Sequence, residues 1–169
     1  MKSLLTALCF CAFLYVYVSC KKNDITTINP SSTIVTILNA NFEQAHIDQK
    51  IDSDGKLDGQ KKSEDALKVT KLDLNGSNKP ANKAIKNLTG IEHFTNLSSL
   101  NCSTNGLTSL DVSKNLALIE LRCSYNNLSS LNISKNLAFT IFHYLGNNLS
   151  NLDVSKNTAL TVWFALKII

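Results

Sequence analysis

The sequence is poor in proline, glycine and aromatic residues. Its 169 residues include two prolines, six glycines and 7% aromatic side chains, whereas Leu, Asn and Ser recur throughout. A chain of this length fits one ordinary domain. The scarcity of chain-breaking residues, together with the recurring ones, favours a repeat over an irregular globule.

The sequence also lacks a strong excess of one charge. Its formal net charge is +4, and removal of Lys2 with an N-terminal leader leaves 16 basic and 13 acidic residues, or +3. The lysines are spread along the chain, whereas nucleic-acid binding needs basic side chains gathered on one face. We therefore expect no nucleic-acid partner.

The first 20 residues have the pattern of an export signal. Lys2 precedes an apolar run over residues 4–18. This run is shorter than the ~20 residues that span a bilayer, and it ends with a small residue before a cysteine. These features favour a signal peptide over a permanent membrane helix.

Residues 17–20, Tyr-Val-Ser-Cys, resemble the bacterial lipobox, in which the cysteine is acylated and becomes the new N-terminus. The resemblance implies a signal peptide over residues 1–19, a lipid on Cys20 and a membrane-anchored lipoprotein at the outer membrane or cell surface. Because Tyr17 replaces the usual Leu, a plain secretory signal or an uncleaved anchor stays open. Residues 20–33 are polar, contain Pro30 and are expected to form a flexible tether.

Few cysteines remain for the folded part of the chain. Cys9 and Cys11 would leave with the signal and Cys20 would carry lipid, so Cys102 and Cys123 are left. Two cysteines do not make a disulfide framework. We expect buried free thiols that pack as small hydrophobic groups, in preference to a bridge.

A repeat of 21 residues is the strongest signal in the sequence. Apolar residues, asparagines, serines and lysines each recur at this offset, too often for coincidence. The aligned columns include Leu100/Leu121/Phe142/Trp163, Asn105/Asn126/Asn147, Leu107/Leu128/Leu149, Leu110/Leu131/Leu152, Lys114/Lys135/Lys156 and Asn115/Asn136/Asn157.

One unit, written Leu97-x-x-Leu100-x-Cys102-x-x-Asn105-x-Leu107, resembles the leucine-rich repeat. The alternation at Leu100 and Cys102 predicts a short strand with one buried face. The expected fold is an α/β-type repeat solenoid: a short leucine-rich-repeat arc with a parallel β-ladder on the concave face and a small helical N-terminal cap.

A more specific resemblance is to the 21-residue, cysteine-containing repeats of Bacteroidetes surface proteins. It is carried by Leu-Asn-Cys-Ser-Thr-Asn at residues 100–105 and Leu-Asp-Val-Ser-Lys-Asn at residues 110–115. It covers residues 70 to about 160. The resemblance implies a surface location and a role in binding or adhesion, with no shared ligand. The expected partner of the concave face is a protein or a glycan.

The columns have separate expected roles. The asparagines aligned with Asn105 lie where the chain leaves the strand, so their amides can satisfy backbone groups of adjacent coils. Residues 111–115 contain turn-forming side chains around one apolar residue, Val112, and predict the outer bend. The lysine column is expected to be a solvated edge.

Residues 34–69 are expected to form the cap that precedes repeats over residues 70–169. Residues 39–49 and 63–69 show helical spacing around an acidic loop, residues 52–59. The arrangement resembles the EF-hand-like segment found before related repeats, which makes calcium the one candidate cofactor.

The candidate calcium ligands Asp52, Asp54, Asp58 and Glu64 do not keep the register of a calcium loop. Such a loop needs oxygen ligands at positions 1, 3 and 5 and a glutamate at 12. Counting from Asp52 places Lys56 at position 5. We expect a solvated turn and no cofactor, with a calcium-stabilised repeat module as an alternative.

The two ends of the repeat region depart from the 21-residue step. Leu72 to Leu100 is 28 residues, which predicts an insertion near residues 79–84. Residues 163–169 are apolar except for Lys167 and stop midway through a coil without a polar cap. We expect a truncated fragment of a larger surface adhesin, with edge-to-edge self-association as an alternative.

The outward strand positions are the expected ligand-binding face, and Arg122 and His143 are favoured because arginine and aromatic groups are common at binding hot spots. The predicted face consists of Lys71, Asp73, Asn101, Glu120, Arg122, Ser124, Ile141, His143 and Phe164.

No catalytic residues are predicted. His46, His93 and His143 lie in no motif with a nucleophile or metal partner. We therefore expect a non-catalytic binding module and not an enzyme.

Overall fold

The computed structural model describes residues 34–164, with the backbone alone for Val162–Phe164. The expected signal peptide, Cys20, the tether and residues 165–169 lie outside this range. The described elements are β1 (Ile34–Thr36), α1 (Ala40–Asp48), β2 (Gln60–Lys62), α2 (Ser63–Leu67), β3 (Lys71–Asp73), η1 (Ala81–Lys83), η2 (Ile91–His93), β4 (Ser99–Asn101), β5 (Glu120–Arg122), β6 (Ile141–His143) and β7 (Val162–Phe164).

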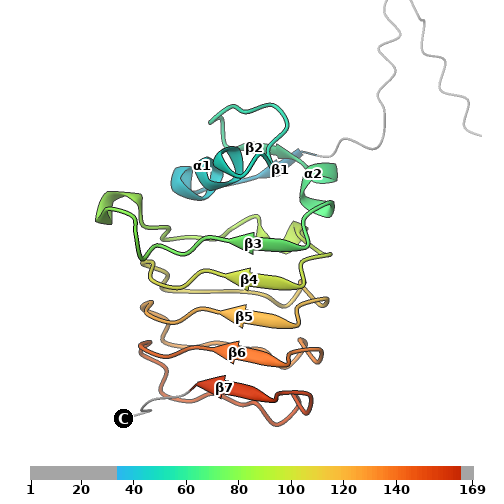
Figure 1. Cartoon of the computed structure of the whole chain (residues 1–169), viewed down its shortest axis with the longest axis vertical. Coiled ribbons are helices and arrows are strands. Elements are labelled where there is room, and N and C mark those ends of the chain that lie inside the picture. Colours follow the sequence, from blue (N-terminus) through green and yellow to red (C-terminus); the bar gives the residue numbers. More distant parts are fainter. Residues whose placement is uncertain (1–33, 165–169) are drawn as a thin grey trace, which may run out of the picture.

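Five short parallel strands form a ladder in the order β3-β4-β5-β6-β7 (Figure 1). Leu100 of β4 pairs with Leu121 of β5, and Leu121 pairs with Phe142 of β6, so the 21-residue period of the sequence is the step between neighbouring strands. The pairing of Leu72 with Leu100 gives the longer first step. The extra residues include η1.

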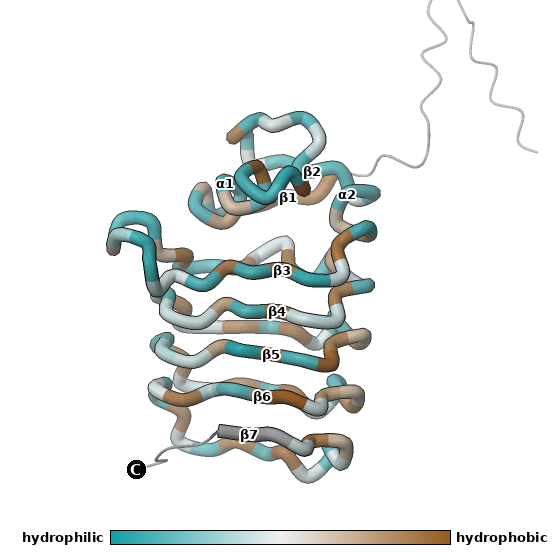
Figure 2. Tube along the Cα trace, viewed as in Figure 1, coloured by the Kyte–Doolittle hydropathy of each residue, from teal (hydrophilic) through white to brown (hydrophobic). Residues whose placement is uncertain are grey.

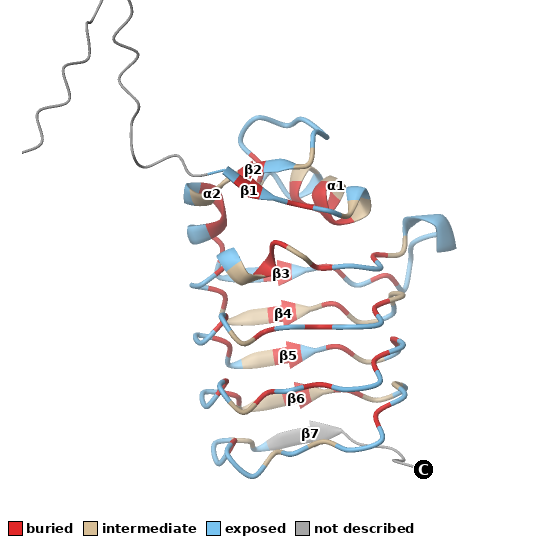
Figure 3. Cartoon of the chain, turned by 180° about the vertical axis from the view of Figure 1, so that it is seen from behind, coloured by how far each residue is buried: buried red, intermediate tan, exposed pale blue. Residues whose placement is uncertain are grey.

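The core lies between the strands and the returning coils behind them. Strand residues Leu72, Leu100, Leu121 and Phe142 are at most 2% exposed, and apolar residues of the returning coils cover them. Figure 2 shows apolar segments recurring at the same places in each coil, and Figure 3 shows the corresponding buried residues. Each such side chain contributes ~1.5–3 kcal/mol, provided that the next coil covers it.

The N-terminal cap closes one end of this core. Asn39 begins α1, its side chain accepting a hydrogen bond from the Phe42 amide at 3.0 Å. The buried side chains of Val35, Phe42 and Ala66 join the same core cluster as the first coils. The helices predicted from the sequence spacing over residues 39–49 and 63–69 are thus present in the cap, as α1 and α2.

The cap is not helical throughout, which corrects the sequence-based expectation. β1 and β2 form a two-stranded antiparallel sheet in which Val35 pairs with Lys61. Each strand has only three residues. So short a segment carries too little alternation to be distinguished from coil, and the pairing depends on contacts that are distant in sequence.

Asparagine side chains connect successive coils at the end of each strand. The Asn126 Nδ2 donates to the carbonyls of Cys102 and Cys123, both at 3.0 Å. Its Oδ1 accepts from the Leu107 amide at 3.1 Å. Asn105 and Asn147 make the equivalent contacts. The structural role predicted for this column is confirmed.

A second asparagine ladder lies in the opposite turn, where only a solvated bend was expected. Asn115, Asn136 and Asn157 are at most 3% exposed. The Asn136 Nδ2 donates to the carbonyls of Val112 at 2.9 Å and of Asn115 at 3.0 Å. The bend does form, but its last residue turns inward because the buried carbonyls of the previous coil need a donor.

Replacing Asn136 with alanine should lower the free energy of unfolding by about 2–4 kcal/mol, because two buried carbonyls lose their donor. Asn132→Ala is the matched control, since Asn132 is exposed in the same coil and only accepts a bond from the Ser134 amide. Urea denaturation followed by circular dichroism measures both. Equal stability of the two variants would contradict the role assigned to the buried ladder.

Candidate ligand-binding face

The outward side chains of β3 to β6 form one surface, which we call the sheet face. The strand register arranges them in two columns, and none of them is buried. One column is Lys71, Ser99, Glu120 and Ile141, and the other is Asp73, Asn101, Arg122 and His143. The alternation in the sequence therefore assigned their direction correctly.

An ion pair on β5 organises the centre of the sheet face. The Arg122 Nε donates to the Glu120 Oε1 at 2.6 Å, and the Ser99 hydroxyl donates to the Glu120 Oε2 at 2.9 Å. The hydrogen bond from Arg122 is the main cause that lowers the pKa of Glu120. Arg122 is thereby held beside a fixed carboxylate while 45% of its side chain stays exposed.

His143 of β6 lies beside Arg122 in the strand register. Partial burial lowers the pKa of His143, the positive charge of Arg122 lowers it further, and Glu120 opposes the shift. The imidazole is therefore neutral at pH 7 and presents one donor and one acceptor nitrogen. Arg122 and His143 thus place a guanidinium and an imidazole at neighbouring positions of the sheet face.

The sheet face becomes less polar along the stack. β3 presents the charged Lys71 and Asp73, whereas β6 presents the half-buried Ile141 and, just beyond the strand, the half-buried Leu145. Leu145 was not among the predicted residues, although its column, Ser103/Ser124/Leu145, continues the outward alternation. The change from serine to leucine was the signal available in the sequence.

Tyr125 is a further residue that sequence reasoning missed. Its side chain is 58% exposed although it is a large aromatic group. It aligns with Thr104 and Gly146, and all three have positive φ, at 56°, 56° and 68°. A Cβ on Gly146 would lie 2.7 Å from the Tyr125 ring. The absence of a side chain at Gly146 therefore leaves the space that the ring occupies. This places an exposed aromatic group at the rim of the sheet face.

Two further residues of the predicted face, Ser124 and Phe164, lie outside the two columns of described strand side chains. Ser124 is half-buried and follows β5. Phe164 pairs with His143 in the strand register, while its side chain lies outside the description. The sheet face as described therefore consists of residues from β3 to β6 and the turns that follow them.

The calcium candidates are used for turn contacts in the acidic loop. Oδ1 atoms of Asp52, Asp54 and Asp58 accept from backbone amides two residues ahead, at 2.9–3.3 Å. Glu64 is exposed on α2. Over residues 34–164, no three His, Cys, Asp or Glu side chains gather as a metal site would require.

Partners within the cap hold this loop. The Glu43 carboxylate of α1 accepts from the amides of Asp58 at 2.8 Å and Gly59 at 2.6 Å. Burial raises the pKa of Asp52, while the buried Lys61 attracts it electrostatically. Burial lowers the pKa of Lys61 in turn, and the charges of Asp52 and Asp65 oppose that shift.

His46 and His93 lie away from the sheet face. The His46 ring lies 4.2 Å from the Phe42 ring and 5.1 Å from the Phe94 ring, between centroids. Burial lowers the pKa of His46 to about 3, so it is a neutral core residue. The His93 Nε2 lies 3.7 Å from a Glu92 carboxylate oxygen at the surface.

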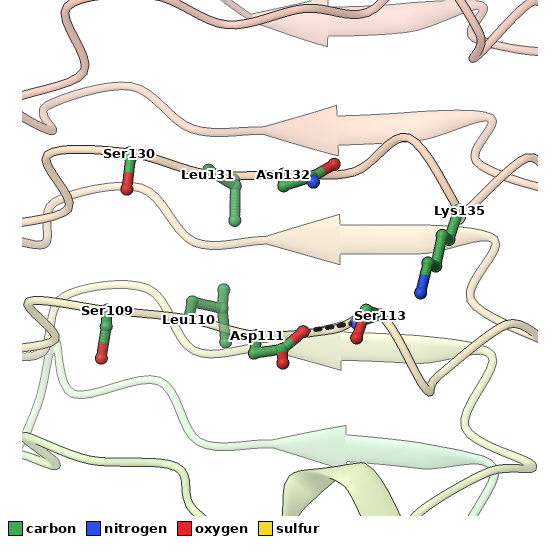
Figure 4. A pocket seen from close by; sticks show the side chains of 8 residues that line it. All are labelled: Ser109, Leu110, Asp111, Ser113, Ser130, Leu131, Asn132 and Lys135. Carbon is green, nitrogen blue, oxygen red and sulfur yellow. Dashed lines mark hydrogen bonds between the residues drawn. The ribbon is translucent and has the colours of Figure 1, made fainter.

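A hollow of about 430 Å³ lies between two coils on the side opposite the strands (Figure 4). Leu110 and Leu131 line it together with serines, Asn132 and Lys135. The Asp111 carboxylate points along it and accepts from the Ser113 amide at 2.8 Å. We refer to this side as the back.

Comparison with solved structures identifies the architecture. The functional domain of InlJ from Listeria monocytogenes, described as including a cysteine ladder, matches with a TM-score of 0.66 and 28% identity, over 78% of this chain and 28% of that chain. The internalin InlF from Listeria monocytogenes matches with a TM-score of 0.63 and 18% identity, over 76% of this chain and 43% of that chain.

The fold is that of a leucine-rich-repeat solenoid. The chain spans less than half the length of either internalin structure. No protein-family model matches it, and the search of curated proteins found no match. Among the described residues, no helix has the length and apolar character needed to cross a membrane.

The cysteines of this leucine-rich-repeat chain form two steps of one buried column. Cys102 and Cys123 are free, 0% exposed and aligned with the buried Leu74 and Tyr144. Burial raises the pKa of Cys102 to about 12 and also raises that of Cys123. The thiols are therefore protonated and inert, as expected of small apolar groups in a core.

Alkylation at pH 8 should leave Cys102 and Cys123 unmodified in the folded leucine-rich-repeat chain, because a pKa near 12 leaves a thiolate fraction on the order of 10⁻⁴. Both should react after denaturation. Peptide-resolved mass spectrometry after iodoacetamide treatment measures this, with Ser124→Cys as a half-buried outward control. Rapid labelling of Cys102 in the folded chain would contradict its assigned burial.

Proposed function

We propose that the chain is an exported, lipid-anchored leucine-rich-repeat module that binds a protein ligand through its sheet face without catalysis. The leucine-rich-repeat fold shared with internalin structures supports a role in protein interaction or adhesion. The finer assignment to the surface lipoproteins of Bacteroidetes rests on the 21-residue repeat motif and on residues 17–20.

The arrangement of Glu120, Arg122 and His143 is the observation that carries this proposal. Arg122 is oriented before any ligand arrives, because Glu120 holds its Nε at 2.6 Å. A guanidinium that is already ordered loses less entropy on binding. Ile141 and Leu145 add apolar surface beside it, so the site combines directional hydrogen bonds with area to bury.

A protein ligand fits this surface better than a small molecule. Small-molecule sites are concave and mostly apolar, whereas the sheet face is a ladder of alternating outward side chains. The sign of the charge reverses along each column, from Lys71 to Glu120 in one and from Asp73 to Arg122 in the other. This pattern favours a partner with complementary charged groups. A glycan is the second candidate, supported by the exposed Tyr125 ring at the rim, because aromatic faces stack on sugar rings.

The absence of catalysis is part of the proposal. Cys102 and Cys123 are buried with raised pKa values, and His46 is enclosed between two phenylalanine rings. These groups do not reach a substrate. The exposed groups on the sheet face are suited to recognition.

An alternative is that this chain is one part of a larger surface adhesin. Standard protein interfaces bury about 800 Å² on each partner, and four strands with outward pairs provide a short surface. The chain covers 28% of the InlJ structure and 43% of the InlF structure. In this case the sheet face would still contribute binding, as part of a longer ladder.

Arg122→Ala and His143→Ala should each weaken ligand binding by about tenfold or more, as expected for hot-spot residues. The ligand would first be selected from an array of extracellular proteins and glycans, and affinities would then be measured by surface plasmon resonance. Ser130→Ala on the back is the control and should change the affinity less than twofold. Loss of binding in Ser130→Ala, with unchanged binding in Arg122→Ala, would contradict a binding site on the sheet face and indicate one on the back.

Cys20→Ala should abolish acylation of the full chain expressed in a bacterial host, because the thiol that forms the thioether is removed. Metabolic labelling with palmitate, with detection of the labelled protein, measures this. Cys11→Ala is the matched control within the signal region. Equal labelling of Cys20→Ala and the original chain would exclude a lipid at Cys20.

A further inference from the structure

Large apolar side chains are exposed along one edge of the solenoid. Leu67, Leu116, Ile119 and Leu137 are 45%, 57%, 47% and 58% exposed. Leu67 ends α2, and the other three lie in the turns that lead into β5 and β6. We call this set, with Lys114, Lys135 and Lys156, the turn edge. Exposed apolar groups gathered in this way indicate a contact surface.

Lysines accompany the exposed leucines on the turn edge. Lys114 and Lys135 precede Leu116 and Leu137 by two residues, and both lysines are exposed. Among the described residues, the ion pairs are those of Lys68, His93 and Arg122, so the turn-edge lysines have no carboxylate partner within 4.0 Å. No close ion pair therefore neutralises their charges.

The carboxylates of the same turns accept hydrogen bonds from backbone amides and also attract the turn-edge lysines: Asp111 attracts Lys114 and Lys135, and Asp153 attracts Lys156. Asp111 and Asp153 accept hydrogen bonds from the amides of Ser113 and Ser155, each at 2.8 Å. Asp111 lines the hollow on the back (Figure 4). The other exposed acidic groups near the turn edge are Glu92, beside His93, and Glu64 on α2. The turn edge thus carries three lysines and four exposed apolar side chains, and the two aspartates only partly offset its positive charge.

The turns lie one above another along one side of the stack, as Figures 1 and 3 show from opposite directions. Neighbouring strands in a sheet are ~4.8 Å apart, so the equivalent side chains of successive turns are close together. A row of protruding turns contacts a flat surface at several points at once. A groove for a single peptide segment would need a concave shape.

We propose that the turn edge docks against an anionic lipid surface. The leucines and Ile119 enter the boundary between headgroups and acyl chains, while the lysine stems lie along this apolar layer and their ammonium groups reach the phosphates. α2 and the N-terminal end of β1 lie on the same side of the stack (Figures 1 and 3). A chain anchored ahead of β1 would therefore enter the folded part on the side of the turn edge.

The consequence is a fixed orientation. The turn edge lies where the chain enters the strands. Docking through this edge leaves the sheet face exposed to solvent and accessible to a ligand. This inference uses one part of the proposed function, attachment through Cys20, and is independent of what the sheet face binds. The failure of either can be seen separately in the following experiment.

The test uses the full chain, recovered in its acylated form and reconstituted into vesicles of phosphatidylcholine with or without phosphatidylglycerol. An environment-sensitive dye is attached at Ala138→Cys, which is exposed beside Leu137, or at Asn132→Cys on the back as the control. Cys102 and Cys123 are 0% exposed and remain unlabelled. Absence of the chain from sedimented vesicles would refute the lipid anchor. It would also overturn the docking proposal, which uses attachment through Cys20.

We expect a blue shift of dye emission at position 138, but not at position 132, and only with phosphatidylglycerol. Changing Lys114, Lys135 and Lys156 together to Gln should shift the docking equilibrium by on the order of 100-fold toward the undocked state and remove the blue shift. An unshifted dye on a chain that does sediment would overturn the docking proposal, as would the same shift in both kinds of vesicle.

The same charge change made elsewhere is the matched control. Lys79, Lys83 and Lys86 are exposed in and beside η1, at the opposite end of the strands. Changing these three to Gln should leave the shift at position 138 intact. An equal loss in both triple variants would show that only net charge matters, and would overturn the assignment to the turn edge.

Discussion

Hydrogen bonds from buried asparagine amides hold each coil to the one before it. Asn126 and Asn136 occupy opposite turns of one coil, and each donates to two backbone carbonyls that water cannot reach. These bonds fix the separation at which leucines of neighbouring coils cover one another. Because a single coil cannot bury its own apolar face, the core and the sheet face both depend on this spacing.

Much of this arrangement could be predicted from the sequence, because residues with the same structural role recur at the same position of each 21-residue unit. The strand positions, the buried column of Cys102 and Cys123, and the role of the Asn126 column followed from recurrence alone. Asn136 was missed as a buried group because its neighbours are turn-forming residues. Tyr125 was missed because it occurs once, and its exposure depends on Gly146 in the next coil.

The solenoid distributes different chemistry over its surfaces. The sheet face carries an ordered Arg122 beside apolar residues of β6, the back carries serines, leucines and Asp111 around a hollow that Lys135 also lines, and the turn edge carries lysines and exposed apolar side chains. Each surface takes one set of columns from the same repeat.

Native-state hydrogen exchange tests most directly whether the asparagine ladders hold the coils together. The amides of Leu107 and Leu128 donate to the side chains of Asn126 and Asn147, both at 3.1 Å. The account predicts that both amides exchange only through global unfolding, with the same free energy as the amide of Cys102, which follows β4 and donates to the Arg122 carbonyl. Exchange of Leu107 and Leu128 through local fluctuations, while Cys102 stays protected, would contradict it.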